Sequence, residues 1–167
     1  MNRLLGTLLI AIATAGMGQA QLKIAIISSQ KALLETDEIK KAQVDLEARF
    51  KPRQDQILKL EKDLQDIQAQ LQSGKLNQLG EQDLTAQGQK KQRDLQRMQQ
   101  DLQEDVERER TDILQRAGTR MQEVVKKIAD EKGLDLVVDA ANTLYFKAAL
   151  DLTADAVAGY NKTYPVK

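Results

Sequence analysis

The side chains best suited to chemistry in this sequence are carboxylates and bases in a long, charge-rich middle region. Acidic residues stand close together at Glu104-Asp105 and at Glu107 and Glu109, and in an enclosed cleft such pairs can serve general acid–base catalysis. On a solvent-exposed helix they lack the desolvation that shifts a pKa for this work. The chain has no histidine and no cysteine, which removes the commonest general base, the thiol nucleophile and the usual zinc ligands. We therefore predict a protein that is not an enzyme and uses no metal or cofactor.

One local cluster of basic residues suggests a second kind of chemistry, the binding of anions. The default interpretation is a solvated helix face whose charges pair with nearby acids, because Asp94 and Asp101 partly offset the cluster. The alternative is a peripheral contact with anionic lipid headgroups, such as lipopolysaccharide or a membrane surface, or with acidic segments of a partner protein. The cluster consists of Lys90, Lys91, Arg93 and Arg97.

The overall charge argues against nucleic acid as the main partner. The chain has 25 basic and 25 acidic residues. A protein that binds a phosphate backbone presents a broad cationic face, and this balance does not provide one.

The first twenty residues have the pattern of a secretory signal peptide. Arg3 precedes an apolar run from Leu4 to Ala15, and small residues at Gly18 and Ala20 suit cleavage after Ala20. The run is well short of the roughly 20 apolar residues that cross a bilayer, although an uncleaved membrane anchor remains the alternative. We predict that the mature chain is exported. Removal of Arg3 then leaves the mature chain with a formal charge of −1.

Apolar residues at three- and four-residue spacing predict two long helices that pair as an antiparallel coiled-coil hairpin over residues 36–132. The first helix is expected to begin near Thr36 or Asp37, and Pro52 predicts a kink rather than an end, because the pattern resumes in register. An arm of this kind has almost no interior, so it cannot enclose an active site. The stripe consists of Leu46, Phe50, Ile57, Leu60, Leu64, Ile67 and Leu71, then Leu95, Met98, Leu102, Val106, Ile113, Ala117, Met121, Val124 and Ile128.

The tip of this arm is predicted at residues 73–88. Ser73-Gly74, Gly80 and Gly88 weaken the helical pattern there and indicate a turn with a loosely helical tip. The second helix is expected from about Lys90 until Gly133, a residue type that ends many helices. Helices of this length make an arm of roughly 50–70 Å.

Residues 21–35 and 133–167 are left to form a small body at the base of the arm. Lys23 to Ile27 predicts a buried strand, and residues 134–139 and 143–146 predict a β-hairpin, followed by a short helix to about residue 161. A core this small rarely folds alone without disulfides or metal. We therefore predict an α+β fold in which the strands of several subunits share one sheet or barrel.

Apolar residues outside the seam of the hairpin are the candidates for contact with a client protein. Scattered apolar side chains are normal on protein surfaces, and weak contact with an unfolded chain is the functional alternative. The candidates are Leu58, Leu76, Leu79, Leu84 and Leu114.

The order of these elements, together with several short motifs, resembles the Skp/OmpH family of periplasmic chaperones. The motifs are Lys23-Ile24-Ala25-Ile26, Gln30-Lys31-Ala32-Leu33-Leu34 and Lys40-Lys41-Ala42 near the start, and Leu136-Val137-Val138-Asp139 and Leu152-Thr153 near the end. The resemblance covers essentially the whole mature chain. It implies a homotrimer in which a small β-barrel, built from all three subunits, carries three arms around a cavity. In that arrangement the residues lining the trimer core are Ile24, Ile26, Leu136 and Val138.

The resemblance further implies an ATP-independent holdase that cages unfolded outer-membrane proteins between its arms. Such clients have alternating apolar strands and open edges, so they aggregate unless they are isolated. This chain departs from the family where Ser28 replaces a common acidic residue, and its near-neutral charge differs from the strongly basic arms of characterised relatives. We therefore carry over no lipid-binding site. The alternative function is an exported coiled-coil scaffold that docks one folded envelope protein.

Overall fold

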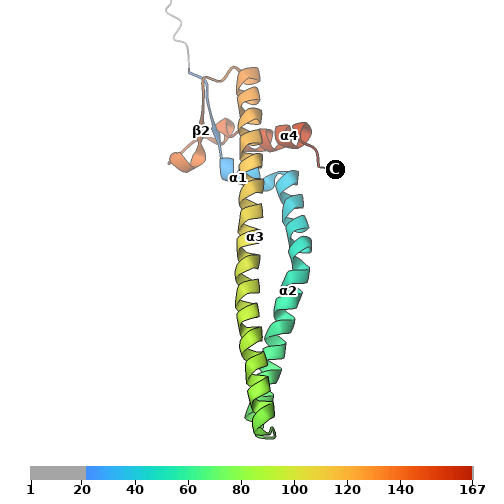
Figure 1. Cartoon of the computed structure of the whole chain (residues 1–167). Coiled ribbons are helices and arrows are strands. Elements are labelled where there is room, and N and C mark those ends of the chain that lie inside the picture. The colour runs from blue at the N-terminus through green and yellow to red at the C-terminus, as the bar shows by residue number, and fades with distance from the viewer. Residues whose placement is uncertain (1–21, 167) are drawn as a thin grey trace, which may run out of the picture.

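The computed structural model describes residues 22–166 and shows a long two-helix hairpin that projects from a small body of strands and short helices (Figure 1). This arrangement confirms the predicted α+β fold with a helical-hairpin arm. The predicted signal peptide, residues 1–20, lies outside the described residues. Within the described part of the chain, no helix combines the length and the apolar character needed to span a bilayer. In chain order the elements are β1 (Ile24–Ile27), α1 (Ser29–Glu35), α2 (Asp37–Gln72), α3 (Gln78–Lys132), β2 (Leu136–Asp139), η1 (Ala140–Asn142), η2 (Ala148–Leu150) and α4 (Thr153–Thr163).

Helix α2 forms the outgoing half of the arm and begins where the sequence predicts. Thr36 is its N-cap, because the Thr36 hydroxyl accepts a hydrogen bond from the Ile39 N–H at 3.3 Å. Asp37 and Glu38 lie in the first turn, where negative charge is favoured by the helix dipole. The helix continues through Pro52, so the prediction that this proline does not end the helix is confirmed.

The turn between α2 and α3 is tighter than the sequence predicts. It occupies residues 73–77, and α3 begins at Gln78, inside the range predicted for a loose tip. Gly74 has a φ of 63°, a backbone conformation that residues with a side chain rarely adopt. The Asn77 side chain caps α3 by accepting a hydrogen bond from the Gly80 N–H at 2.8 Å.

Gly88 has a different role from the one predicted. It lies inside α3, where a Cβ atom would stand 3.3 Å from Ile67 Cγ2 of α2. Glycine inside a helix costs about 1 kcal/mol relative to alanine. Here it lets the two helices approach closely near the tip.

The seam between α2 and α3 is a narrow strip rather than a core. Each helix has one long neighbour, so most predicted stripe residues are only partly covered. The arm therefore has little interior, as the sequence predicts. The buried residues are Ile39, Phe50, Ile57 and Ile67 on α2, and Leu95, Ala117, Met121 and Val124 on α3.

The two strands of the body pair in parallel, with Ile24 opposite Leu136 and Ile27 opposite Asp139. The predicted β-hairpin is therefore wrong, since β2 pairs with β1 and residues 143–146 form no strand. The cause is local. The Asp139 side chain accepts a hydrogen bond from the Ala141 N–H at 2.8 Å and starts the 3-10 turn η1, which directs the chain away from β2. The whole helical hairpin serves as the crossover that a parallel pair requires.

The main hydrophobic core lies where the arm meets the body. Helix α4 packs against the base of α3 (Figure 1), and a Cβ atom on Gly159 would stand 3.1 Å from Val124 Cγ1. Since β1 and all four α-helices contribute to one core, the base of the arm and the body form one unit. The core residues are Ile27, Ala32, Ile39, Ala117, Met121, Val124, Ala156 and Tyr160.

Candidate functional site

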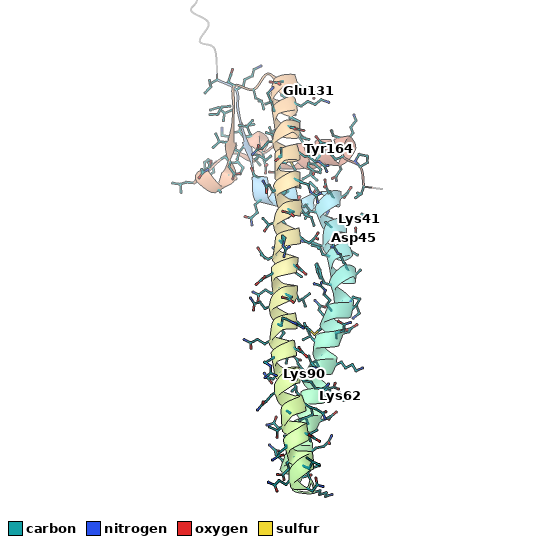
Figure 2. All side chains as sticks on the ribbon, in the orientation of Figure 1. Lys41, Asp45, Lys62, Lys90, Glu131 and Tyr164 are labelled. Carbon is teal, nitrogen blue, oxygen red and sulfur yellow. The ribbon has the colours of Figure 1, made fainter. Side chains whose placement is uncertain are left out.

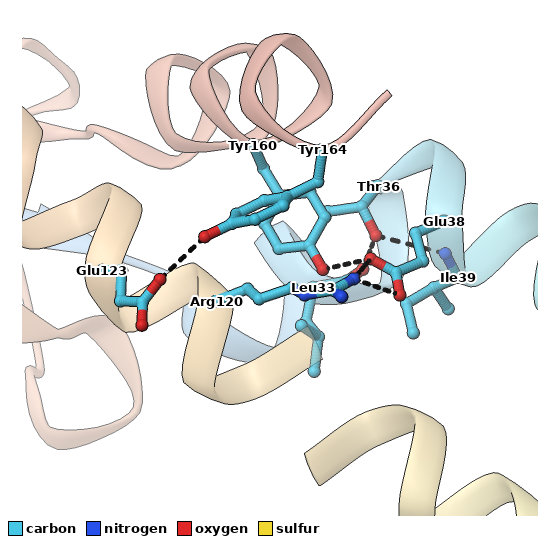
Figure 3. Close-up of polar contacts among 8 residues, drawn as sticks. All are labelled: Leu33, Thr36, Glu38, Ile39, Arg120, Glu123, Tyr160 and Tyr164. Carbon is cyan, nitrogen blue, oxygen red and sulfur yellow. Dashed lines mark hydrogen bonds and ion pairs between the residues drawn. The ribbon is translucent and has the colours of Figure 1, made fainter. Parts of the chain in front are cut away.

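Six residues fasten the arm to the body, and we call this cluster the arm joint (Figure 3). Arg120 of α3 donates hydrogen bonds from Nη1 to both carboxylate oxygens of Glu38 on α2, at 2.8 and 2.9 Å. The Tyr160 hydroxyl of α4 donates to the same carboxylate. Three helices therefore converge on one side chain. The members of the arm joint are Thr36, Glu38, Arg120, Glu123, Tyr160 and Tyr164.

Electrostatics reinforce this convergence. The hydrogen bond to Glu38 raises the pKa of Arg120, so the guanidinium stays charged. Burial, and then the hydrogen bond to Glu38, raise the pKa of Tyr160, so its hydroxyl keeps the proton that it donates. The Tyr160 side chain is fully buried, and a buried hydroxyl without a partner costs free energy. In the arm joint, Glu38 provides the partner for this hydroxyl.

Tyr164 extends the joint along α3. Its ring centre lies 4.9 Å from the Arg120 Cζ and 5.2 Å from the Tyr160 ring centre, which is within the range of cation–π and aromatic contacts. Its hydroxyl donates a hydrogen bond to Glu123 at 2.7 Å, and this bond raises the pKa of Tyr164. Helix α4 is therefore tied to two positions of α3 as well as to α2.

One edge of the arm, which we call the ion-paired edge, is held by salt bridges between α2 and α3. Helix α2 contributes one member of each pair and α3 the other. The pairs are Arg49 with Glu109, Arg53 with Asp105, and Asp63 with Lys91. Their partners lower the pKa of Asp63 and Asp105, in each case chiefly through a hydrogen bond. Exposed pairs of this kind each contribute little stability.

Three of the four carboxylates that the sequence brings together have structural partners. Asp105 binds both Arg53 and Arg108, Glu109 binds Arg49, and Glu104 accepts a hydrogen bond from Gln100. None of them lies in an enclosed cavity. Among residues 22–166 no group of three or more acidic residues could hold a metal ion.

The five leucines proposed as client contacts do not form one patch. Leu58 and Leu79 are the most exposed, at 61% and 67%, while the other three are partly covered. Leu58 lines a hollow in the middle of the arm and Leu114 lines another near the base. Leu76, Leu79 and Leu84 lie at the tip.

The basic cluster is partly neutralised by its neighbours. Lys91 binds Asp63, and Arg97 lies 3.6 Å from Asp94. Lys90 and Arg93 are exposed on α3 and form no ion pair with any of residues 22–166. Figure 2 shows Lys90 in the tip-ward half of the arm. An anion contact at this cluster stays a prediction.

The four residues proposed for the trimer core share one face of the small sheet. The parallel register places Ile24 beside Leu136 and Ile26 beside Val138, and alternate residues of a strand point to the same side. Their exposure differs, because Ile26 is already buried within one chain whereas Leu136 is 46% exposed. Their role in a trimer stays a prediction.

Sequence reasoning missed the arm joint. On the sequence alone, neither Glu38 nor Tyr160 is a candidate functional residue. No spacing pattern links two residues that lie 122 positions apart. The available signal was chemical, since a tyrosine on the buried side of a helix needs a partner for its hydroxyl.

Comparison with known proteins places these features in a family. A family model described as "Outer membrane protein (OmpH-like)" matches residues 23–160. The chain is 28% identical over 154 residues to a Skp-like protein of Pseudomonas aeruginosa, covering 91% of this chain and 92% of that protein. It is 31% identical over 152 residues to the chaperone protein Skp of Salmonella typhimurium, covering 89% of this chain and 92% of the relative.

The fold leads to the same group. A crystal structure of a putative outer membrane chaperone (OmpH-like) from Caulobacter crescentus superposes with a TM-score of 0.75 at 18% identity, over 90% of both chains. At this identity the likeness concerns the fold alone. The family match over residues 23–160 and the 31% identity to the Salmonella typhimurium chaperone show that the chain belongs to the Skp/OmpH family of outer membrane chaperones.

Proposed function

We propose that this chain is an exported, ATP-independent holdase that takes up unfolded outer-membrane proteins between its helical arms. One observation carries the proposal above all: in a member of the Skp/OmpH family, a long hairpin with almost no interior projects from a small body. A protruding arm offers surface to a large client without enclosing a reaction centre. Weak contact over a long surface isolates an unfolded chain and still releases it.

The proposed holdase is a homotrimer with a shared β-barrel. Within the described residues, β2 has a hydrogen-bonded strand neighbour on one side only, which is β1, and an open strand edge favours pairing with another chain. Large apolar side chains are exposed nearby, and their burial by further subunits would stabilise the assembly. These are Leu136, Leu144, Tyr145 and Leu150, with exposed fractions of 46, 108, 81 and 38%.

The proposed compartment is the periplasm, reached through a signal peptide cleaved after Ala20. Arg3 and the apolar run that follows it support this assignment. Mass spectrometry of the exported protein tests it, since a chain that starts at Gln21 supports cleavage and a chain that starts at Met1 contradicts it.

The function is tested by diluting a urea-unfolded porin into buffer with and without the purified mature chain. We expect near-stoichiometric trimer to keep the porin soluble, with light scattering from the same sample reporting three chains per particle. The control is a folded porin in detergent, which a holdase should not bind. A scaffold would ignore the unfolded porin and bind one native envelope protein. Precipitation of the porin at the same rate with and without the chain would overturn the proposal.

A further inference from the structure

The two edges of the hairpin differ in chemistry. The salt bridges between α2 and α3 lie along the ion-paired edge. Helical periodicity places Asp105 and Glu109 of that edge on one side of the α3 seam, and Gln103 and Arg110 on the other. We call this other side the open edge. Neither Glu107 nor Arg110, which lie there, is in an ion pair with any of residues 22–166.

The open edge is hollowed in two successive places. The first hollow, of about 590 Å³, has an apolar floor that includes Ile57, Leu58 and Val106. The second, of about 270 Å³, lies nearer the body between Leu34 and Leu114. Glu107 lines the first and Arg110 the second, so less than one helical turn separates them and the hollows form a run along α3.

Glutamine amides surround these apolar floors. Gln54, Gln99 and Gln103 line the first hollow and Gln43 lines the second. Among them, Gln99 donates a hydrogen bond to Glu61 at 3.0 Å. A side-chain amide offers both donors and an acceptor. It therefore complements the N–H and C=O groups of a polypeptide backbone better than a charged side chain does.

The two hollows of the open edge are lined by charged residues of opposite sign. Glu61 and Glu107 line the tip-ward hollow, and Arg110 lines the hollow nearer the body. A segment with a cation toward the tip and an anion toward the body would match both signs. The apolar floor would take its alternate side chains, since those of an extended chain point to the same side.

We propose that the open edge is a binding groove for an extended, unfolded polypeptide segment with alternating apolar residues and opposite charges near its two ends. This inference rests on the proposed holdase function and names the surface and the kind of segment involved. From Gln99 to Leu114 the groove runs for about 22 Å at ~1.5 Å per residue. An extended segment of about seven residues spans that length.

The test uses fluorescein-labelled peptides of nine residues, capped at both ends, in which valine alternates with glutamine. One carries lysine near one end and glutamate near the other. Two controls carry lysine at both ends or glutamate at both ends. Fluorescence anisotropy with the purified mature chain should show the mixed peptide binding up to about fivefold more tightly than either control, the range of an exposed ion pair.

Matched variants locate the site. Leu58→Ser should weaken binding of the mixed peptide about tenfold, because a leucine that becomes buried in the complex is lost. Leu79→Ser removes a leucine of similar exposure at the tip and should leave the affinity unchanged. Arg110→Glu should make the peptide with two lysines the best ligand. Arg53→Gln, on the ion-paired edge, should not alter the order of preference.

Two results would overturn the groove: equal effects of Leu58→Ser and Leu79→Ser, or no binding of any peptide by the parent chain. Circular dichroism of each variant excludes unfolding as the cause. The porin aggregation assay on the same samples separates the two proposals. If the parent chain protects porin while the variants are indistinguishable, the groove fails and the holdase function stands. If the parent chain does not protect porin, the holdase function fails.

Discussion

The hydroxyl of Tyr160 donates a hydrogen bond to Glu38, although the two residues lie 122 positions apart in the chain. The contact joins the last helix to the first turn of α2, at the point where the arm leaves the body (Figure 3). Arg120 from α3 binds the same carboxylate. A tilt of the arm relative to the body therefore strains at least one of these bonds.

Removal of the Tyr160 hydroxyl should destabilise the protein. Tyr160→Phe leaves Glu38 with one partner fewer, and a hydrogen bond to a charged group contributes about 1.5–3 kcal/mol. We expect the free energy of unfolding in urea to fall by that amount. Tyr164→Phe is the control, since its hydroxyl bonds to Glu123 at an exposed position and its loss should matter less. An equal effect of the two variants would contradict a special role for the buried bond.

Stability should also depend on alkaline pH through the same residue. The folded state raises the pKa of Tyr160 above its ordinary value of 10.0. The neutral hydroxyl is therefore favoured in the folded state, and its contribution is complete below pH 10 and is lost as the pH rises above 10. Urea unfolding between pH 8 and 11 should show a steeper decline for the parent chain than for Tyr160→Phe. Parallel curves would contradict the assignment.

Substitutions at two adjacent residues of α2 should affect stability differently, because only one of them lies in the seam of the arm. Ile57 is 8% exposed in the seam, whereas Leu58 is 61% exposed. Ile57→Ala should lower the free energy of unfolding by about 2–4 kcal/mol, because it leaves a cavity between the helices. Leu58→Ala should change it by less than about 0.5 kcal/mol. Thermal unfolding followed by circular dichroism at 222 nm compares the two, and similar losses would show that the seam is misplaced.

Assembly should depend on the exposed face of the sheet. Leu136→Asp places a charge where we propose that chains meet, and burial of an unpaired charge is costly. Light scattering should report a mass that falls from three chains toward one. Val44→Asp is the matched control, because Val44 is 65% exposed on α2, outside the body. A trimer that survives Leu136→Asp would exclude this face from the interface.

The arm could be predicted from sequence because its information is local. The three- and four-residue spacing of residues such as Phe50 and Ile57 identifies a helix within a few turns. Gly133 likewise indicates the end of α3, where it adopts the left-handed conformation. Gly88 does not indicate an end, because it lies inside α3. The register of the body could not be predicted, because the strand of Leu136 pairs with Ile24 across the whole arm rather than with the next apolar segment.

The candidate sites, like the fold, could be predicted only where the information in the sequence is local. The leucines and the basic cluster were recognisable as residue types, but their surroundings were not. Lys91 forms a salt bridge with Asp63, and Leu58 lines a hollow together with residues of α3. The arm joint depends on three helices meeting at Glu38. Such a meeting depends on tertiary packing, which no spacing within the chain reveals.

The tight turn at residues 73–77 lies at the far end of the arm from the paired strands (Figure 1). Equal lengths added to or removed from α2 and α3 would therefore leave Ile24 opposite Leu136. Insertions of whole heptads would also preserve the apolar seam. The length of the arm can therefore change independently of the body. Evolution, or a protein engineer, can lengthen the arm to suit larger cargo while the base keeps its form.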